Sequence, residues 1–362
     1  MSAGIRILSG LGEKGPACLR LDFFNRRWLL DCGEGPEDDA IFDPAWLTKV
    51  NAVFITHDHV DHIGAAHHAI AAGLPIYCTA ATARALPPGA DVNILPPSGE
   101  IQVDGVTVTT GRTGHSYGGV WLHFSLGGGV FYSGDFCTES DCFLFETPPD
   151  AATVLLDASY GLERTRQRVR MDAVIDTVAR LDGQILFPVP PSGRASEMAL
   201  LFEQHGIADW TMDARCYGWV RRMLSEEGRD YIKPDAINIL RDVSDKARDF
   251  NADARIMLCH APCGTRGMAG DLIARWENDG RLGRDAHVIF TGYMAAPARA
   301  MVADGKAHFR RWNVHPLLDD VVSVANSCHA MQIVPLFHNR PEDFGLVDGF
   351  EGRLQLADRF YV

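Results

Sequence analysis

The pattern of apolar residues changes near residue 170, and this change constrains the fold more than any other feature of the sequence. Before it, short runs rich in β-branched and aromatic residues are separated by glycine and proline, as in IRILSG, RWLLDCG and GVFYSGD, and these runs predict strands. After it, amphipathic segments such as MDAVIDTVARLDG alternate with apolar runs such as QILFPVP. Alternating helices and strands predict βαβ units on a parallel sheet. We therefore expect one compact α/β body with a second α/β unit inserted into it.

Composition narrows the class of protein. Of the 362 residues, 46% are hydrophobic and 22% are charged, as in a soluble globular protein with a large core. No apolar run approaches the roughly 20 residues that span a bilayer, and the first residues lack the apolar core of a signal peptide. The nine cysteines include no CxxC pair, so a disulfide framework is not expected. We expect a cytoplasmic protein without membrane partners.

The charge balance bears on the partners of the protein. Lys and Arg number 34 and Asp and Glu number 47, which gives a net charge of −13. Such acidity disfavours broad electrostatic capture of nucleic acid, so a nuclease of this composition needs a local basic cleft. The candidates to line such a cleft are Arg194, Arg266, Arg310 and Arg311.

The heptapeptide THDHVDH directly follows the apolar run AVFI and concentrates metal-ligating side chains at the end of a buried strand. Because alternate side chains of extended backbone point the same way, His57 and His59 can reach one metal ion. Asp61 and His62 come where the chain turns into a helix, and they can reach a second ion. Surface histidines at a helix N-terminus are the alternative, but the density of ligands favours metal. Asp58, between two ligands, is a candidate to orient them or to act as a base.

Four segments resemble, in order, the motifs of the metallo-β-lactamase fold, an αββα sandwich. HDHVDH resembles the HxHxDH signature, and LLDCGEG resembles the first motif, in which Asp31 would orient the ligand loop. TGHSYGG resembles the third motif, in which His115 would bind the first metal. FYSGDF resembles the fourth, in which Asp135 would bridge both metals. Each motif is weak alone, but four in sequence predict the fold.

The rest of the chain is similar to the β-CASP nucleases, which include ribonuclease J and the pre-mRNA 3′-end processing endonuclease. LLDASYG resembles the acidic motif A, with Asp157, and WNVHPLLDDV resembles motif B, with His315. VPLFHN resembles motif C, with His338. The resemblance implies a metallo-β-lactamase domain over residues 1–168, an inserted β-CASP-like α/β domain of mostly parallel sheet over 169–305, and a return to the first domain over 306–362.

This resemblance also implies a reaction. Two divalent ions, zinc first and manganese or iron as alternatives, would generate a metal-bound hydroxide that attacks a phosphodiester. His315 would protonate the leaving alkoxide, with Asp157 holding its imidazole. The implied ligands are His57, His59 and His115 for one metal, Asp61, His62 and His338 for the other, and Asp135 as the bridge.

Two of these assignments have ordinary alternatives. His315 precedes Pro316 and could simply lead into the helix at residue 319. His338 could end a strand as a histidine with its hydrogen bonds satisfied.

Candidate phosphate contacts lie in two glycine-containing turns. SGRASE places a hydroxyl and a guanidinium at a helix N-terminus, where phosphate can bind, although an ordinary N-cap is the alternative. CHAPCGTRGMAGD stands where the family usually has a Ser-Gly-Met turn, and it lacks the serine and methionine of that turn. Its His260, Cys259 and Cys263 could suggest an extra metal, but a strand end before a turn is the commoner explanation. The candidate phosphate contacts are Ser192, Arg194, Gly264, Arg266 and Gly267.

The leading hypothesis is therefore a metal-dependent ribonuclease. RNA is favoured over DNA because the DNA-repair branch of the family typically lacks the motif C histidine, which is present here as His338. The alternatives are the same chemistry on a small phosphodiester or ester, or a DNA exonuclease. A non-catalytic partner protein is disfavoured because all seven expected ligands are present. The partner is expected to be nucleic acid, and a homo-oligomer stays possible.

Overall fold

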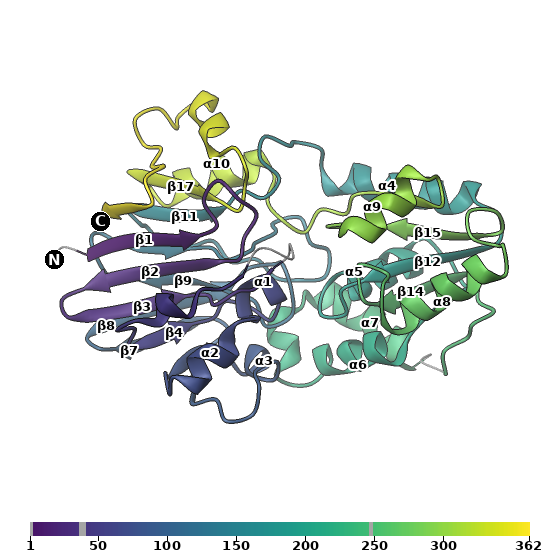
Figure 1. The fold of residues 1–362 in the computed structure, drawn as a ribbon, viewed down its shortest axis with the longest axis horizontal. Coiled ribbons are helices and arrows are strands. Elements are labelled where there is room, and N and C mark those ends of the chain that lie inside the picture. The colour runs from purple at the N-terminus through teal and green to yellow at the C-terminus, as the bar shows by residue number, and fades with distance from the viewer. Residues whose placement is uncertain (1–2, 36–40, 246–248) are drawn as a thin grey trace. The chain divides into compact units, whose positions relative to one another are not determined.

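The computed structural model describes residues 3–35, 41–245 and 249–362, and the chain divides into two compact units (Figure 1). Unit 1 consists of Met1–Thr138, Leu144–Arg164 and His315–Val362, and unit 2 of Glu139–Phe143 and Thr165–Val314. The predicted inserted domain, 169–305, lies within unit 2. No helix among the described residues is both long and apolar enough to cross a membrane.

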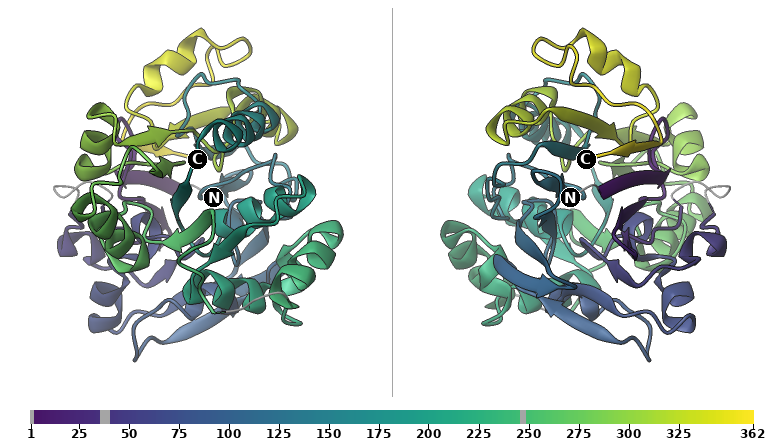
Figure 2. Two further views of the ribbon diagram at one scale, coloured as in Figure 1. Left: turned by 90° about the vertical axis from the view of Figure 1, so that its right-hand side faces the viewer. Right: turned by 90° about the vertical axis from the view of Figure 1, so that its left-hand side faces the viewer.

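Unit 1 contains two mixed sheets. The first has the order β18-β1-β2-β3-β4-β5-β6, in which β18 and β1 pair the two described ends of the chain (Figure 2). The second has the order β17-β11-β10-β9-β8-β7. The first sheet comprises β18 Arg359–Tyr361, β1 Ala3–Ser9, β2 Cys18–Phe23, β3 Arg26–Leu30, β4 Ala52–Phe54, β5 Ile76–Thr79 and β6 Val92–Leu95. The second comprises β17 Gln332–Leu336, β11 Thr153–Asp157, β10 Val130–Tyr132, β9 Val120–Phe124, β8 Val106–Arg112 and β7 Gly99–Val103.

Aromatic side chains join the two sheets of unit 1. Phe124 on β9 lies 5.8 Å from the ring of Trp28 on β3 and 5.6 Å from the ring of Phe54 on β4, measured between ring centroids. The outer face of each sheet is covered by helices, which bury apolar side chains against it. This arrangement confirms the predicted αββα sandwich. The covering helices are α1 Val60–Ile63, α2 Ala66–Ala71 and α3 Ala80–Ala83 beside the first sheet, and α10 Leu318–Ser327 on the second; 3₁₀ turns occupy Pro44–Leu47 and Pro341–Leu346.

The segment HIGAAHHAIAAG, residues 62–73, predicts one short helix that ends at a glycine, whereas the structure has two helices there, α1 and α2. Gly64 lies at the break, and a Cβ placed on it would meet Val60 O at 2.6 Å and Glu34 Cβ at 2.9 Å. Packing of the chain at Gly64 is therefore too close for a side chain. The short helix α1 carries His62 into the interior of the unit.

Unit 2 is built on a parallel sheet of order β13-β14-β12-β15-β16, as the alternation of helices and strands predicts. Successive residues of β12 point to opposite faces: Leu186 packs with α8 and α9, whereas Phe187 contacts Phe202 of α5. The strands are β12 Gln184–Val189, β13 Trp210–Met212, β14 Ile256–His260, β15 Ala286–Phe290 and β16 Ala307–Phe309. The helices are α4 Gln167–Arg180, α5 Arg194–Gln204, α6 Ala214–Met223, α7 Pro234–Asp245, α8 Gly267–Asn278 and α9 Ala296–Ala303, with a 3₁₀ turn at Gly228–Tyr231.

A buried carboxyl ties together separate segments of unit 2. Glu197 on α5 is 5% exposed and accepts hydrogen bonds from Ser140 Oγ at 2.6 Å and from Trp312 Nε1 at 3.0 Å. Burial raises the pKa of Glu197 to about 7, although the hydrogen bonds from Ser140 and Trp312 oppose this rise. Glu197 therefore anchors segments that are far apart in the sequence.

The two ends of the long segment of unit 2 are also bonded to each other. Asn313 Nδ2 donates to Thr165 O over 2.8 Å, and Asn313 N donates to Gln167 Oε1 over 2.7 Å. The start and the end of this segment are thus adjacent.

Candidate metal centre

The polar residues of the histidine cluster and of the later motifs meet at the ends of strands in unit 1. His57 and His59 follow β4, and Asp135 follows β10. His115 lies in the turn between β8 and β9, while Asp157 is the last residue of β11. Apolar strand residues thus fix the backbone on one side, and the polar side chains extend from the strand ends.

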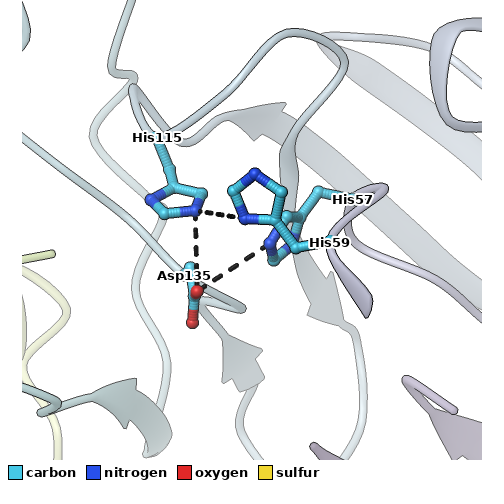
Figure 3. Close-up of side chains that lie close together, drawn as sticks. All are labelled: His57, His59, His115 and Asp135. Atoms are coloured by element: carbon cyan, nitrogen blue, oxygen red, sulfur yellow. Dashed lines mark hydrogen bonds and ion pairs between the residues drawn. The ribbon is translucent and has the colours of Figure 1, made fainter. Parts of the chain in front are cut away.

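The first group of potential ligands is His57, His59, His115 and Asp135, whose facing atoms all lie within 4.8 Å of one another. Figure 3 shows the three imidazoles and the carboxylate turned toward a common point. His115 Nε2 lies 3.0 Å from His59 Nδ1 and 3.6 Å from Asp135 Oδ2. His57 Nε2 lies 3.8 Å from the same Asp135 oxygen. Four predicted ligands are therefore brought together.

The chemistry of this group fits a divalent cation. His57 is 1% exposed, and its Nε2 has no hydrogen-bond partner among the residues that the structure describes. Burial lowers the pKa of His57 well below its usual range, and the nearby His62 and His59 lower it further. A neutral imidazole whose buried nitrogen faces a carboxylate is a donor set that suits zinc and related ions.

The second group is Asp61, His62 and Asp135, again within 4.8 Å of one another. His62 Nε2 lies 3.2 Å from Asp135 Oδ1. Burial alone would lower the pKa of His62, but the carboxylates of Asp135 and Asp31 raise it well above its usual range. Burial likewise raises the pKa of Asp135, but His62 and His315 lower it well below its usual range. The site therefore favours positive charge beside Asp135.

Asp31 holds the opposite side of the His62 ring. Its Oδ2 lies 2.7 Å from His62 Nδ1 and accepts from Tyr132 Oη over 2.6 Å. Its Oδ1 accepts from Thr56 N over 2.8 Å. Asp31 is fully buried and adopts a left-handed backbone with φ 58°, so its own conformation is costly and is held by these contacts. The sequence gives no signal for Tyr132, an aromatic residue in an ordinary strand pattern.

A third group links the centre to the later motifs. Asp135, Asp157 and His315 offer atoms within 4.8 Å of one another. His315 Nδ1 lies 2.8 Å from Asp157 Oδ2 and 3.6 Å from Asp135 Oδ2. The second oxygen of Asp157 accepts from Ser159 N over 2.9 Å. The contact with Asp157 occupies Nδ1 of the His315 ring and leaves Nε2 out of this pair.

Two predicted residues lie outside these groups. His338 follows β17 and joins none of the three groups among the described residues; its ring packs so closely on Gly161 that a Cβ there would meet Nε2 at 2.8 Å. Burial lowers the pKa of His338, and the cations Arg340 and Lys14 lower it further, against Asp343 and Glu342. Asp58 is half-buried beside His57 and also stands outside the groups.

The candidate phosphate residues lie in unit 2. Ser192 and Arg194 are 4% and 7% exposed, and Arg194 Nη1 lies 3.5 Å from Thr291 Oγ1. The N-cap of α5 is Gly193, so Ser192 is not the N-cap. The Arg194 guanidinium packs on Gly292, where a Cβ would meet it at 2.4 Å. Arg194 therefore serves the interior of unit 2 in this structure.

A second histidine–aspartate pair joins the end of β14, His260, to Asp213, which follows β13. His260 Nδ1 lies 2.5 Å from Asp213 Oδ2, and Gly267 packs against the other side of the ring. Cys259 is buried, and Cys263 is half-buried. These residues do not form a group of three potential metal ligands among the described residues. The alternative of an extra metal in the turn after β14 therefore gains no support.

The four arginines expected to line a basic cleft all belong to unit 2. Arg310 Nε donates to Thr177 Oγ1 over 2.7 Å, whereas Arg194 faces Thr291. Arg266 is exposed at the start of α8.

Comparison with known proteins agrees with this geometry. Residues 26–189 match the family described as the β-lactamase superfamily domain. The transcription termination factor FttA of Methanothermobacter thermautotrophicus is 29% identical in an alignment that covers 57% of this chain and 41% of the relative. Cleavage and polyadenylation specificity factor 73 of Drosophila melanogaster is 26% identical, with 55% of this chain and 35% of the relative covered. The chain spans about two fifths of the length of the first curated relatives it matches.

A solved structure supports the fold over the whole chain. A protein of unknown function from Enterococcus faecalis V583 has a TM-score of 0.61 and 13% identity, and the alignment covers 100% of both chains. At this identity the likeness concerns the fold alone. The family match confirms the predicted resemblance to the metallo-β-lactamase fold, and the Drosophila relative agrees with the predicted resemblance to the pre-mRNA 3′-end processing endonuclease.

Proposed function

From the β-lactamase superfamily domain that residues 26–189 carry, we propose that this protein is a metal-dependent phosphodiester hydrolase of the β-CASP type, acting on RNA. The observation that carries the proposal is the meeting of three groups of potential ligands at one carboxylate, Asp135. Such a shared carboxylate is the arrangement that places two ions side by side for phosphoryl chemistry.

The residues present fit two divalent ions. His57, His59 and His115 would hold one, and Asp61 and His62 would hold the other, with Asp135 shared by both groups. His338 stays a proposed ligand of the second ion, although it lies outside the second group in this structure. Zinc suits this set best, with manganese or iron as alternatives. When bound, two such ions make water a stronger acid and neutralise charge on the phosphate. Asp31 would keep the His62 ring oriented through its 2.7 Å contact with Nδ1.

The remaining polar residues would handle the protons. In the hydrolysis, water adds its oxygen to phosphorus and the P–O bond to the leaving alkoxide breaks. Asp58, beside the ligands, would receive the proton that the water loses. His315 would deliver a proton from Nε2 to the leaving oxygen, because Asp157 holds Nδ1 at 2.8 Å.

RNA is the proposed substrate because the relatives' names concern transcription termination and cleavage with polyadenylation. Residues Ser192, Arg194, Gly264, Arg266 and Gly267 stay proposed phosphate contacts, as do a cytoplasmic location and assembly of identical copies. A DNA substrate is the variant of this proposal that the same assay tests.

A small phosphodiester is the second candidate substrate. It is favoured by the net charge of −13. A short diester needs fewer backbone contacts than a polynucleotide does.

The experiment pairs metal analysis with turnover. Purified protein is loaded with zinc or manganese, its metal content is measured, and cleavage is followed on end-labelled single-stranded RNA, on DNA of the same sequence and on bis(p-nitrophenyl) phosphate. Two metals per chain with RNA cleavage support the proposal. Turnover of the small diester alone moves the protein to the second candidate, and no phosphodiester cleavage by metal-loaded protein overturns both.

A further inference from the structure

The loop between β1 and β2 is fixed against the candidate metal centre from both of its ends. At its start, Phe337 N donates to Gly10 O over 2.7 Å, which ties the loop to the residue that follows β17. At its end, Ala17 N donates to Asp61 O over 2.8 Å, which ties it to the second ligand group. Lys14 lies between these two attachments, so its position relative to the centre is set by hydrogen bonds.

The carboxylate of Glu13, which precedes Lys14 in the sequence, accepts hydrogen bonds from other residues. Glu13 Oε1 accepts from Ser9 Oγ over 2.7 Å and from Gly10 N over 3.1 Å, so its carboxylate closes the loop on itself. Among the residues that the structure describes, Lys14 forms no ion pair with a carboxylate. Lys14 as a residue is half-buried, so its side chain is within reach of a ligand from solvent.

Lys14 reaches the catalytic pair proposed above through one residue. Lys14 Nζ donates to Ser159 Oγ over 2.9 Å, and Ser159 N donates to Asp157 Oδ1 over 2.9 Å. The other oxygen of Asp157 holds His315 at 2.8 Å. Every member of this chain of contacts belongs to unit 1.

The negative charge around the candidate metal centre bears on which substrates the Lys14 ammonium would favour. Asp61, Asp135 and Asp157 all lie in the ligand groups, and the whole chain carries a net charge of −13. A phosphodiester is an anion, whereas a carboxylic ester is neutral. An ammonium is a compact point charge that binds phosphate oxygens, so it would favour the diester only.

We propose that Lys14 binds a non-bridging oxygen of the substrate phosphate and thereby selects phosphodiesters over neutral esters. This inference rests on the proposed function and adds a substrate contact from the first loop of the chain. On binding, the Lys14 ammonium exchanges Ser159 Oγ for the phosphate oxygen, and no bond of the reaction is made or broken by it.

The test compares three proteins loaded with metal: Lys14→Gln, Lys14→Arg, and Lys49→Gln as a matched control. Lys49 is an exposed lysine of unit 1 beside the turn between β2 and β3, and its change removes the same charge without touching a residue of the ligand groups. Each is assayed on bis(p-nitrophenyl) phosphate and on p-nitrophenyl acetate. Calorimetry measures binding of a phosphorothioate-linked dinucleotide, so that affinity is known independently of turnover.

Lys14→Gln is expected to lower kcat/KM for the diester and to weaken dinucleotide binding, each roughly 10- to 100-fold, as for loss of a hydrogen bond to a charged group. Acetate turnover and metal content should not change, Lys14→Arg should keep most of the affinity, and Lys49→Gln should match the wild type. Equal losses on diester and acetate, or unchanged dinucleotide affinity in Lys14→Gln, would overturn the inference. A wild-type protein that binds the dinucleotide but cleaves no diester would overturn the proposed function instead, and the affinities would still test Lys14.

Discussion

Two histidine–aspartate pairs, one in each unit, share nearly the same contact and differ in everything around it. In unit 1, His315 Nδ1 lies 2.8 Å from Asp157 Oδ2. In unit 2, His260 Nδ1 lies 2.5 Å from Asp213 Oδ2. Asp157 ends β11 and Asp213 directly follows β13, so each aspartate extends from the end of a parallel strand.

The surroundings separate the two pairs. Asp157 and His315 lie close to Asp135, which is also a member of the other two ligand groups. Asp213 instead accepts from Cys216 N over 2.9 Å as the N-cap of α6, and from His260 N over 2.7 Å. The first pair thus faces charged groups that could act on a substrate, while the second closes a helix end and a strand end. A histidine–aspartate contact alone therefore does not identify a catalytic site.

Removing a metal ligand should have the largest effect on turnover. The change in structure should be confined to unit 1. We expect His59→Ala to lose metal content and to reduce phosphodiester turnover to background, because His59 is a member of the first ligand group. Metal analysis and the diester assay on the same preparation check this. Full metal content together with normal turnover would remove the first group from the site.

The direct contrast is between the two histidines. His315→Ala should keep bound metal and lower kcat roughly 10²–10⁴-fold, as for loss of a general acid. His260→Ala is the matched control and should leave kcat within about twofold, since His260 belongs to none of the ligand groups and its Nδ1 contacts the N-cap residue of α6. Steady-state kinetics on bis(p-nitrophenyl) phosphate measures both. A metal-loaded His315→Ala protein with normal turnover, or a comparable loss in His260→Ala, would reverse the roles given to the two pairs.

The buried carboxyl of Glu197 in unit 2 should make the free energy of unfolding depend on pH. Glu197 has a folded pKa of about 7, against its ordinary value of 4.5, so the folded protein holds this proton more tightly than the unfolded chain. Its contribution to the free energy of unfolding is therefore largest below pH 4.5 and declines as pH rises toward 7, by about 3 kcal/mol at 1.36 kcal/mol for each pH unit.

Urea unfolding at pH 5 and pH 8, with a chelator present, compares wild type with Glu197→Gln. The wild type should lose more stability between the two pH values than the variant, because the amide does not titrate. Equal pH dependence in the two proteins would show that Glu197 is already ionised in the folded state at pH 5.

The smallest effect should come from the unit 2 pair itself. Asp213→Ala removes the N-cap of α6 and should lower the free energy of unfolding by about 1–2 kcal/mol. Activity per folded molecule should stay at the wild-type level. Urea unfolding and the diester assay test the two halves of this expectation separately, and a loss of turnover in folded Asp213→Ala would contradict the structural role.

Local sequence patterns explain which parts of the site could be predicted. The spacing of His57 and His59 after an apolar strand is a short-range pattern, and the structure brings both nitrogens to one point. Tyr132 is about 100 residues away from the carboxylate it contacts, and its hydrogen bond depends on how the two sheets pack. No pattern within a single strand carries that information.

The fold shows the same limit. The long strands of unit 2 carry clear apolar runs, whereas β13 and β16 have three residues each and gave no prediction. The segment after the histidine cluster predicts one helix, whereas the structure has two short helices separated at Gly64 and Ala65. A Cβ on Gly64 would meet Glu34, which is 30 residues away in the sequence, and a local pattern carries no information on such a neighbour.

The hydrogen bonds from Asn313 to Thr165 and Gln167 bear on how such a protein could arise and be re-engineered. When the first and last residues of an inserted segment are adjacent, the two host residues that flank it stay as close together as in a tight turn. A long segment can therefore be inserted into a loop without moving the host strands apart. Residues 166–312 are thus replaceable, in principle, by a short glycine-containing linker. The excursion Glu139–Phe143, whose Cys142 O accepts from Lys233 N, would need polar substitutions in such a minimised unit 1.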